Sequence, residues 1–232
     1  MPKNKKNTFM EIAYQGILQK IMREQFIPGM PLREDHLAAE LGISSTPIRE
    51  AFRRLEYEGW LQSSPFRGVY LRKYTRNDIS ELYSLRGALE SAAAAAAARN
   101  ADEKDLEKIR WALKTKQEYI QTHISCGKES NKPPIEHELN FHAAVAEAAH
   151  NQLLSQRLNM LKAQTAYLLL NWRNNDASSA EDLQRAQEEH WMIFLTIQRH
   201  WDDQAKSLME KHILFARENH LKYLDDHQES AE

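Results

Sequence analysis

The chain has 232 residues with a formal net charge of −2, and 28% of them are charged. Its mean hydropathy is −0.69, and it has no apolar run long enough to span a membrane, which excludes an integral membrane protein. A single cysteine excludes an intrachain disulfide, and the start of the chain lacks the apolar core of a signal peptide. We therefore expect a cytoplasmic protein with room for two modest domains.

Charge is divided unevenly along the chain. Residues 1–74 hold 12 Lys and Arg against 8 Asp and Glu, whereas the remainder holds 19 against 25. A basic first part beside an acidic second part indicates two different roles in one chain, although the overall charge of −2 by itself argues against nucleic acid. Glycine and proline are scarce, and Ala92 to Ala98 form an unbroken alanine run. The sequence predicts a mostly α protein.

The first residues, 1–8, are polar and Lys-rich, and we interpret them as a disordered arm. Apolar residues then recur at helical spacing from Phe9 to Phe26, before the Pro28-Gly29 pair that ends such a pattern. A second, short helix is expected over 34–41. Gly42 is placed to end it as a glycine that follows a helix does.

A third helix is expected to begin with Thr46 as its N-cap and Pro47 at its first position, and to run to about Glu58. Alternating residues at 60–62 and 69–72 predict two short strands, and the six residues between them form a wing. The order of helix, glycine turn, basic helix and wing predicts a winged helix-turn-helix, a layout that binds duplex DNA.

This winged domain is predicted over residues 9–74, with its recognition helix in the major groove. The residues expected to contact DNA are Arg33, Ser44, Ser45, Thr46, Arg49, Arg53, Arg67 and Gly68. Arg49 and Arg53 lie four apart and share a helix face, and arginine binds guanine edges or phosphates. Arg67 at the wing is expected to enter the minor groove. The alternative is that these arginines only solvate a surface helix, but the whole arrangement favours DNA binding.

After a linker near 72–76 the pattern is helical throughout. Helices are expected near 77–100, 102–124, 134–149, 151–173, 180–200 and 202–226. Because short breaks join most of them, we expect residues 75–232 to form an all-α antiparallel helical bundle.

Four side chains in this region have the spacing of a metal site. Glu138 and His142 lie four apart on one helix, so they leave the same face. His190 and His212 each lie about ten residues from the Asp202-Asp203 turn, which puts them at equal height in a helical hairpin. Three nitrogen donors and one oxygen suit zinc, nickel, manganese or iron. The chain has ten histidines, so surface or core histidines remain the alternative.

Signatures of an enzyme are missing from the sequence. Glu147 and His150 form a single ExxH pair, whereas a di-iron site needs two with further glutamates. The sequence has no HExxH, no Gly-rich phosphate loop and no GxSxG. We interpret five other histidines as surface residues: His123, His137, His200, His220 and His227.

The segment PLREDHLAAELGISSTPIREAFRRLEYEGWL resembles the winged-helix domain of the GntR family of bacterial transcription regulators, over residues 10–72. The resemblance implies that Thr46, Arg49, Arg67 and Gly68 contact DNA. The chain departs from the family pattern at Ser45, because many relatives have Arg directly before Thr-Pro.

Residues 77–226 resemble the all-helical, FCD-like effector domain of the FadR-type branch of that family. In its metal-binding members, an Asp and a His four apart pair with two later histidines. The runs ELNFHAAVAEAAHN, EEHW and KHI match this pattern at His142, His190 and His212, with Glu138 where most relatives have Asp. Arg86, in LRGALE, matches a position that helps to bind the carboxylate of the effector. Its alternative role is a surface salt bridge with Glu90.

The resemblance implies a homodimeric regulator, by expectation a repressor, that binds a palindromic operator in double-stranded DNA. A small carboxylate effector would bind beside the divalent metal in residues 75–232, which would also dimerise. Two alternatives stay open. One is a metal-responsive regulator with no organic effector, and the other is a metal-dependent enzyme fused to a DNA-binding head.

Overall fold

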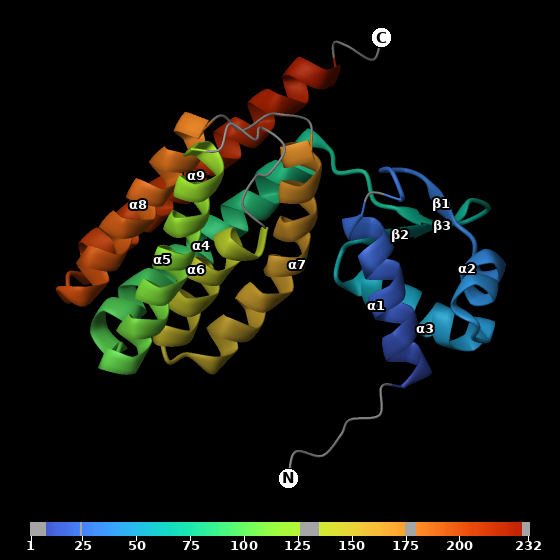
Figure 1. The fold of residues 1–232 in the computed structure, drawn as a ribbon, viewed down its shortest axis with the longest axis horizontal. Coiled ribbons are helices and arrows are strands. Elements are labelled where there is room, and N and C mark those ends of the chain that lie inside the picture. The colour runs from blue at the N-terminus through green and yellow to red at the C-terminus, as the bar shows by residue number, and fades with distance from the viewer. Residues whose placement is uncertain (1–7, 24, 126–134, 175–179, 229–232) are drawn as a thin grey trace. The chain divides into compact units, whose positions relative to one another are not determined.

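A computed structural model of the chain describes residues 8–23, 25–125, 135–174 and 180–228. It divides into two compact units, residues 1–73 and 74–232. The first holds a small sheet and short helices, and the second holds helices in the part that is described, so the predicted mostly α fold class is confirmed (Figure 1). Apart from Thr8, the predicted arm lies outside the described residues. The break predicted at 127–134 also lies outside the described residues. Of the break predicted at 174–179, only Asn174 is described, as the last residue of a helix.

The first unit contains three helices and three strands in the described residues. They are α1 (Phe9–Met22), β1 (Pro31–Leu32), α2 (Glu34–Leu41), α3 (Ser45–Tyr57), β2 (Leu61–Ser64) and β3 (Gly68–Leu71). The strands form an antiparallel sheet in the order β1-β3-β2. Ile17, Ile48 and Leu55 are fully buried and join α1 to α3 in one core. Strand β1 was not predicted, because two residues are too few to show alternation.

Two predicted helix boundaries in this unit are wrong. Helix α1 ends at Met22, before the predicted Phe26. Helix α3 begins at Ser45, and its N-cap is Ser44, with extended φ and ψ of −76° and 165°. Thr46 and Pro47 therefore lie within the first turn, where backbone N–H groups have no helical acceptor and a proline costs no hydrogen bond. Gly42 has φ of 66° and ends α2, as predicted.

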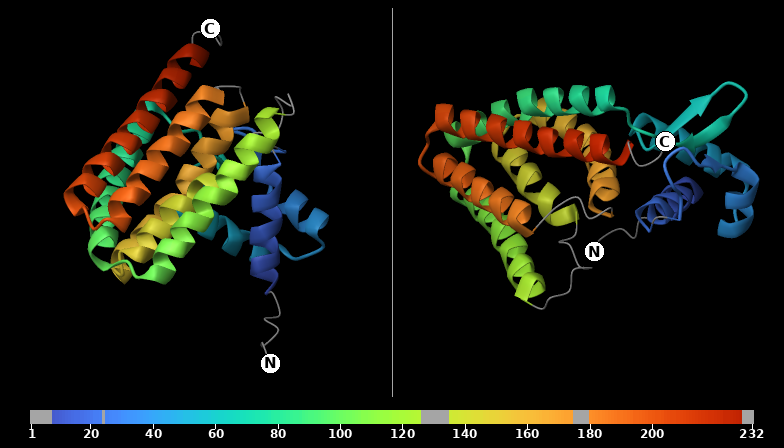
Figure 2. Two further views of the ribbon diagram at one scale, coloured as in Figure 1. Left: turned by 60° about the vertical axis from the view of Figure 1, so that its left-hand side comes forward. Right: turned by 90° about the horizontal axis from the view of Figure 1, so that it is seen from above.

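The second unit is an antiparallel bundle of long helices (Figures 1 and 2). They are α4 (Arg76–Asn100), α5 (Glu103–Ser125), α6 (Ile135–Ala148), α7 (Gln152–Asn174), α8 (Ala180–Gln198) and α9 (Asp202–Gln228). Helix α4 packs along α9, and α5 packs against α6 and α8. The buried alanines of the Ala92–Ala98 run allow the backbone of α4 to approach its neighbours closely. Among the described helices, none is long and apolar enough to cross a membrane.

Candidate functional site

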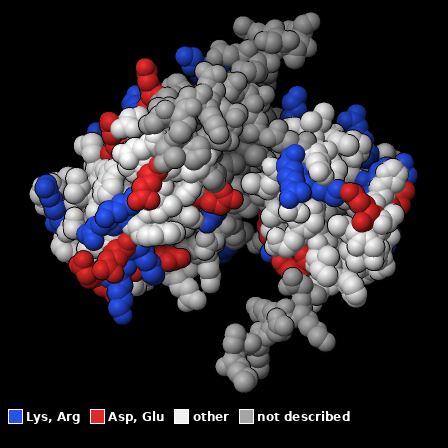
Figure 3. Space-filling view, viewed as in Figure 1, with Lys and Arg blue, Asp and Glu red and all other residues white. Residues whose placement is uncertain are grey.

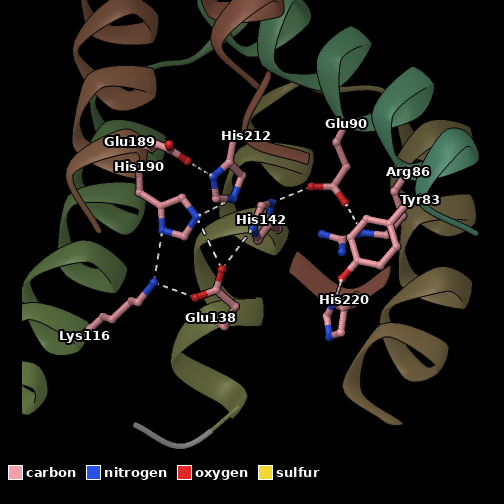
Figure 4. Close-up of polar contacts among 10 residues, drawn as sticks. All are labelled: Tyr83, Arg86, Glu90, Lys116, Glu138, His142, Glu189, His190, His212 and His220. Carbon is pink, nitrogen blue, oxygen red and sulfur yellow. Dashed lines mark hydrogen bonds and ion pairs between the residues drawn. The ribbon is translucent and has the colours of Figure 1, made fainter. Parts of the chain in front are cut away.

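The four predicted metal ligands converge inside the helical bundle (Figure 4). Glu138 and His142 come from α6, His190 from α8 and His212 from α9, and one ligand atom from each lies within 4.8 Å of all the others. The Nε2 atoms of His190 and His212 are 3.0 Å apart. Glu138 Oε1 lies 3.5 Å from His190 Nε2 and 3.7 Å from His142 Nε2. Spacing on one helix and symmetry about the α8–α9 turn thus bring all four together.

Carboxylates outside the cluster orient two of its imidazoles. His142 Nδ1 lies 2.5 Å from Glu90 Oε2 on α4, and His212 Nδ1 lies 2.8 Å from Glu189 Oε2 on α8. Each contact occupies the Nδ1 atom and leaves Nε2 for the centre of the cluster. Metal-binding histidines are commonly held by such a carboxylate. The role of Glu90 and Glu189 in orienting these imidazoles was not predicted from the sequence, because only the tertiary fold brings the carboxylates to the histidines.

Lys116 on α5 lies beside the same cluster. Its side chain is 1% exposed, and its Nζ atom is 2.5 Å from Glu138 Oε2 and 3.4 Å from His190 Nδ1. Sequence reasoning missed this residue, although a signal was present. Leu113 and Ile120 lie three residues before it and four after it, so position 116 falls on the buried face of the helix.

Burial and neighbouring charges set the protonation of the cluster. Burial lowers the pKa of His190 well below its usual value, and the Lys116 charge adds to this effect. Burial also lowers the pKa of His212. Burial opposes ionisation of Glu138, but Lys116 and His190 outweigh it and hold that pKa well below the usual range. His142 behaves differently, since Glu90 outweighs burial and raises its pKa. Metal binding needs an anionic Glu138 and neutral imidazoles, so the shifts of Glu138, His190 and His212 favour it, whereas His142 must give up any proton it holds.

The donor atoms fit a divalent transition metal. Bonds of about 2.1 Å at tetrahedral or octahedral angles separate neighbouring ligand atoms by about 3.0–3.5 Å. The separations of 3.0, 3.5 and 3.7 Å in the cluster are close to that range. Glutamate in place of the family's aspartate is compatible with this geometry, because one oxygen of Glu138 faces the histidines while the other contacts Lys116.

Arg86 lies in the same region of the bundle, but it is buried rather than on the surface. Its Nε donates a hydrogen bond to Glu90 Oε1 over 2.7 Å, and the two residues are only 5% and 6% exposed. The salt bridge considered as an alternative is therefore present, but its predicted surface position is wrong. Burial opposes ionisation of Glu90, yet Arg86 and His142 lower its pKa to about 2.

A cavity of about 30 Å³ adjoins these groups. Its lining includes Arg86, Glu90, His142, Asn159, Lys162 and Thr165. That volume holds about one water molecule, so a larger ligand requires the lining side chains to move. The cavity shares His142 with the cluster, which places cationic and amide side chains next to the candidate metal position.

Two other histidines lie apart from the four ligands. His220 was predicted on the surface, and this is wrong: it is 3% exposed, and its Nδ1 lies 2.6 Å from the hydroxyl of Tyr83. Burial lowers its pKa to about 3. His150 is exposed, and its Nε2 lies 2.7 Å from Oδ2 of the buried Asp105, so the histidine of the single ExxH pair contacts a carboxylate of α5.

The predicted DNA-contacting residues lie directly before α2 and α3, on α3 and on the wing. All are exposed except the half-buried Ser45: Arg33, Ser44, Ser45, Thr46, Arg49, Arg53, Arg67 and Gly68. Arg33 pairs with Asp35 at 2.9 Å, and Arg49 pairs with Glu34 at 2.7 Å. On the opposite side of α3, Ile48 and Phe52 are buried in the core, so the arginine face is held outward.

The wing presents one residue that the sequence analysis did not single out. Phe66 is fully exposed and has φ of 72°, and Gly68 beside it has φ of 71°. Both positive φ values arise in the tight turn that reverses β2 into β3. Both basic and acidic side chains are visible on the winged unit, the basic ones over the larger area, and the two signs are also mixed over the helical unit (Figure 3).

A winged helix-turn-helix joined to a helical bundle is an arrangement of DNA-binding transcription regulators. Two family models match this chain: "Bacterial regulatory proteins, gntR family" over residues 10–71, and "FCD domain" over residues 81–215. The chain therefore belongs to the GntR family, in the FadR-type branch with an FCD domain. Members are transcription regulators, often repressors, and not enzymes, which sets aside the enzyme alternative.

Similar proteins span nearly the whole chain. YdhC of Bacillus subtilis, an HTH-type transcriptional regulator, is 29% identical, with 91% of this chain and 90% of the relative covered. The "Probable D-xylose utilization operon transcriptional repressor" of Paenarthrobacter nicotinovorans is also 29% identical, with 85% and 82% covered. A GntR structure from Rhodococcus sp. RHA1 has a TM-score of 0.71 at 21% identity, with 92% and 97% covered. The Escherichia coli McbR/YncC structure scores 0.68 at 19% identity, with 90% and 95% covered, so both support the fold alone.

Proposed function

We propose that this protein is a cytoplasmic repressor whose affinity for its operator is controlled by a small carboxylate bound at a metal-containing pocket. The observation that carries the proposal is the convergence of Glu138, His142, His190 and His212 beside the buried Arg86. The four side chains could hold a metal ion, and the buried guanidinium of Arg86 in the same bundle could bind an anionic effector.

The DNA-binding part of the proposal rests on the winged unit. Arg49 and Arg53 on the exposed face of α3 would enter the major groove, and Arg67 on the wing would enter the minor groove. A two-fold homodimer, formed through residues 75–232, presents two such units and therefore matches a palindromic operator. The exposed arginines of each unit supply the phosphate contacts on which affinity depends.

The effector part rests on the chemistry of the bundle interior. Glu138 and the three histidines would hold zinc, nickel, manganese or iron, and the ion would act as a Lewis acid toward a carboxylate oxygen. Arg86 would contact the same carboxylate through its guanidinium, which binds carboxylates with two parallel hydrogen bonds. Because Glu90 already pairs with Arg86, the ligand shares or displaces that contact.

A thermal-shift screen tests this proposal. The purified protein is melted with a panel of metabolite carboxylates, with and without prior chelation. A ligand that binds the folded state raises the melting temperature by mass action. We expect a carboxylate whose effect disappears on chelation and returns with added metal. A carboxylate that acts regardless of chelation would retain the regulator and reject the role of the metal.

The small cavity favours a second candidate, a metal-responsive regulator with no organic effector. The cavity that described residues line beside Arg86 is about 30 Å³, which is too small for an organic acid unless side chains move. In that case operator affinity depends on the metal alone, and no carboxylate changes the melting temperature. The same screen therefore separates the two candidates.

A further inference from the structure

We propose that Lys116 is a built-in counter-charge of the metal site, which keeps the metal-free domain stable and weakens metal binding so that the ion exchanges. The inference rests on the metal site proposed above and adds a residue that determines its affinity. Lys116 is not one of the ligands, since its ammonium group has no lone pair to donate. It acts through Glu138, the one anionic ligand of the cluster.

The two carboxylate oxygens of Glu138 face different groups, one the lysine and the other the histidines. Oε2 contacts the ammonium of Lys116 at 2.5 Å, whereas Oε1 faces the Nε2 atoms of His190 and His142 at 3.5 and 3.7 Å. The longer side chain of glutamate, compared with aspartate, gives this carboxylate reach from α6 toward α5. Lys116 and Glu138 thus form a pair in which the ammonium and a bound cation would share one carboxylate.

The other charged groups around the cluster are already matched. Glu90 is engaged by Arg86 at 2.7 Å, and Glu189 is engaged by Arg185 at 3.1 Å. Among the contacts described, Lys116 is therefore the cation that faces Glu138 directly. A buried carboxylate without a cation is strongly unfavourable, so this ammonium stabilises the domain when no metal is bound.

The same ammonium opposes a metal. A divalent ion bound at Oε1 would lie within a few ångströms of the Lys116 charge, in a buried region where screening by water is weak. Like charges repel, so the affinity for the ion is lower than the four ligands alone would give. Removing the charge deprives Glu138 of its lysine partner in the metal-free protein and relieves repulsion in the metal-bound one, and both effects favour binding.

The test compares zinc affinity of the full-length protein with that of Lys116→Met, measured by competition with a chromophoric chelator. Methionine keeps the unbranched shape of the side chain and removes its charge. We expect Lys116→Met to bind Zn²⁺ at least about tenfold more tightly, within the range reported for residues just outside a ligand set. The rise in melting temperature on adding Zn²⁺ should also be larger than in the wild type. Lys114→Met, an exposed lysine on the same helix, is the matched control and should leave both quantities unchanged.

Two further variants make the outcome decisive. Lys116→Gln also removes the charge and should show the same direction, including where Lys116→Met folds only with Zn²⁺ present. In a Glu138→Gln background, Lys116→Met should tighten binding less than in the wild-type background, because only the direct repulsion between the two cations remains to be relieved. Equal or weaker Zn²⁺ binding by both charge-removing variants would overturn the inference. Failure of the wild type to bind Zn²⁺ would instead reject the metal site itself.

Discussion

Glu90 contacts both Arg86 and the candidate metal ligand His142, and replacing it with glutamine should destabilise the helical domain strongly. Its pKa of about 2, against 4.5 for a free glutamate, corresponds to about 3 kcal/mol of interaction that favours the folded state, at 1.36 kcal/mol per pKa unit. Breaking a buried ion pair by removing one partner costs about 3–5 kcal/mol in measured cases, which agrees with that value. Glu90→Gln should therefore lower the free energy of unfolding by about 3 kcal/mol.

Urea unfolding at pH 7 with chelator present measures this loss. Glu188→Gln on the exposed surface of α8 is the matched control and should change stability by less than about 0.5 kcal/mol. The pH dependence has a defined sign: a depressed carboxyl pKa stabilises above pH 4.5, and that stabilisation is lost as pH falls toward 2. A Glu90→Gln variant within 1 kcal/mol of the wild type would refute the reasoning.

Three further predictions concern the DNA-binding surface and a buried histidine. Arg49→Ala should weaken operator binding by about 1–3 kcal/mol in a mobility-shift assay, and unchanged affinity would contradict the assignment of α3 as recognition helix. Arg67→Ala on the wing should reduce the slope of log affinity against log salt by about 1, because one phosphate contact is lost. An unaltered slope would show that Arg67 contacts no phosphate. His220, with its pKa lowered to about 3, is stabilising above pH 6.5, and this contribution is lost as pH falls. Lowering the pH from 7.5 to 5 should therefore cost the His220→Gln variant about 2 kcal/mol less stability than the wild type, as measured by urea unfolding. An equal loss in both proteins would contradict this prediction.

Local patterns were sufficient to predict the fold class and the clustering of the four candidate ligands. Glu138 and His142 lie on one face because the helix has a fixed period, and His190 and His212 align because they flank a turn equally. Gly42 could be assigned to the end of α2 because glycine adopts a φ of 66° without steric strain. These features depend on residues near one another in the chain.

Features that depend on tertiary packing escaped prediction. The spacing of α5 placed position 116 on a buried face, but only the fold shows that Lys116 meets Glu138 there. Likewise, His220 resembled a surface residue until packing of α9 on α4 brought it to Tyr83. The error at Thr46 has a different cause, since Ser44 and Thr46 are both suitable N-caps and residue type alone does not choose between them.

Operator binding in the presence of a carboxylate tests the central claim most directly. An operator selected from a random duplex library is titrated with metal-loaded and with chelated protein, each with and without the carboxylate found by thermal shift. The account predicts that the carboxylate changes affinity by about 5- to 150-fold in the metal-loaded protein only, the usual range of allosteric coupling. The change should also be lost in His212→Ala. An equal change in chelated protein, or none in metal-loaded protein, would contradict it.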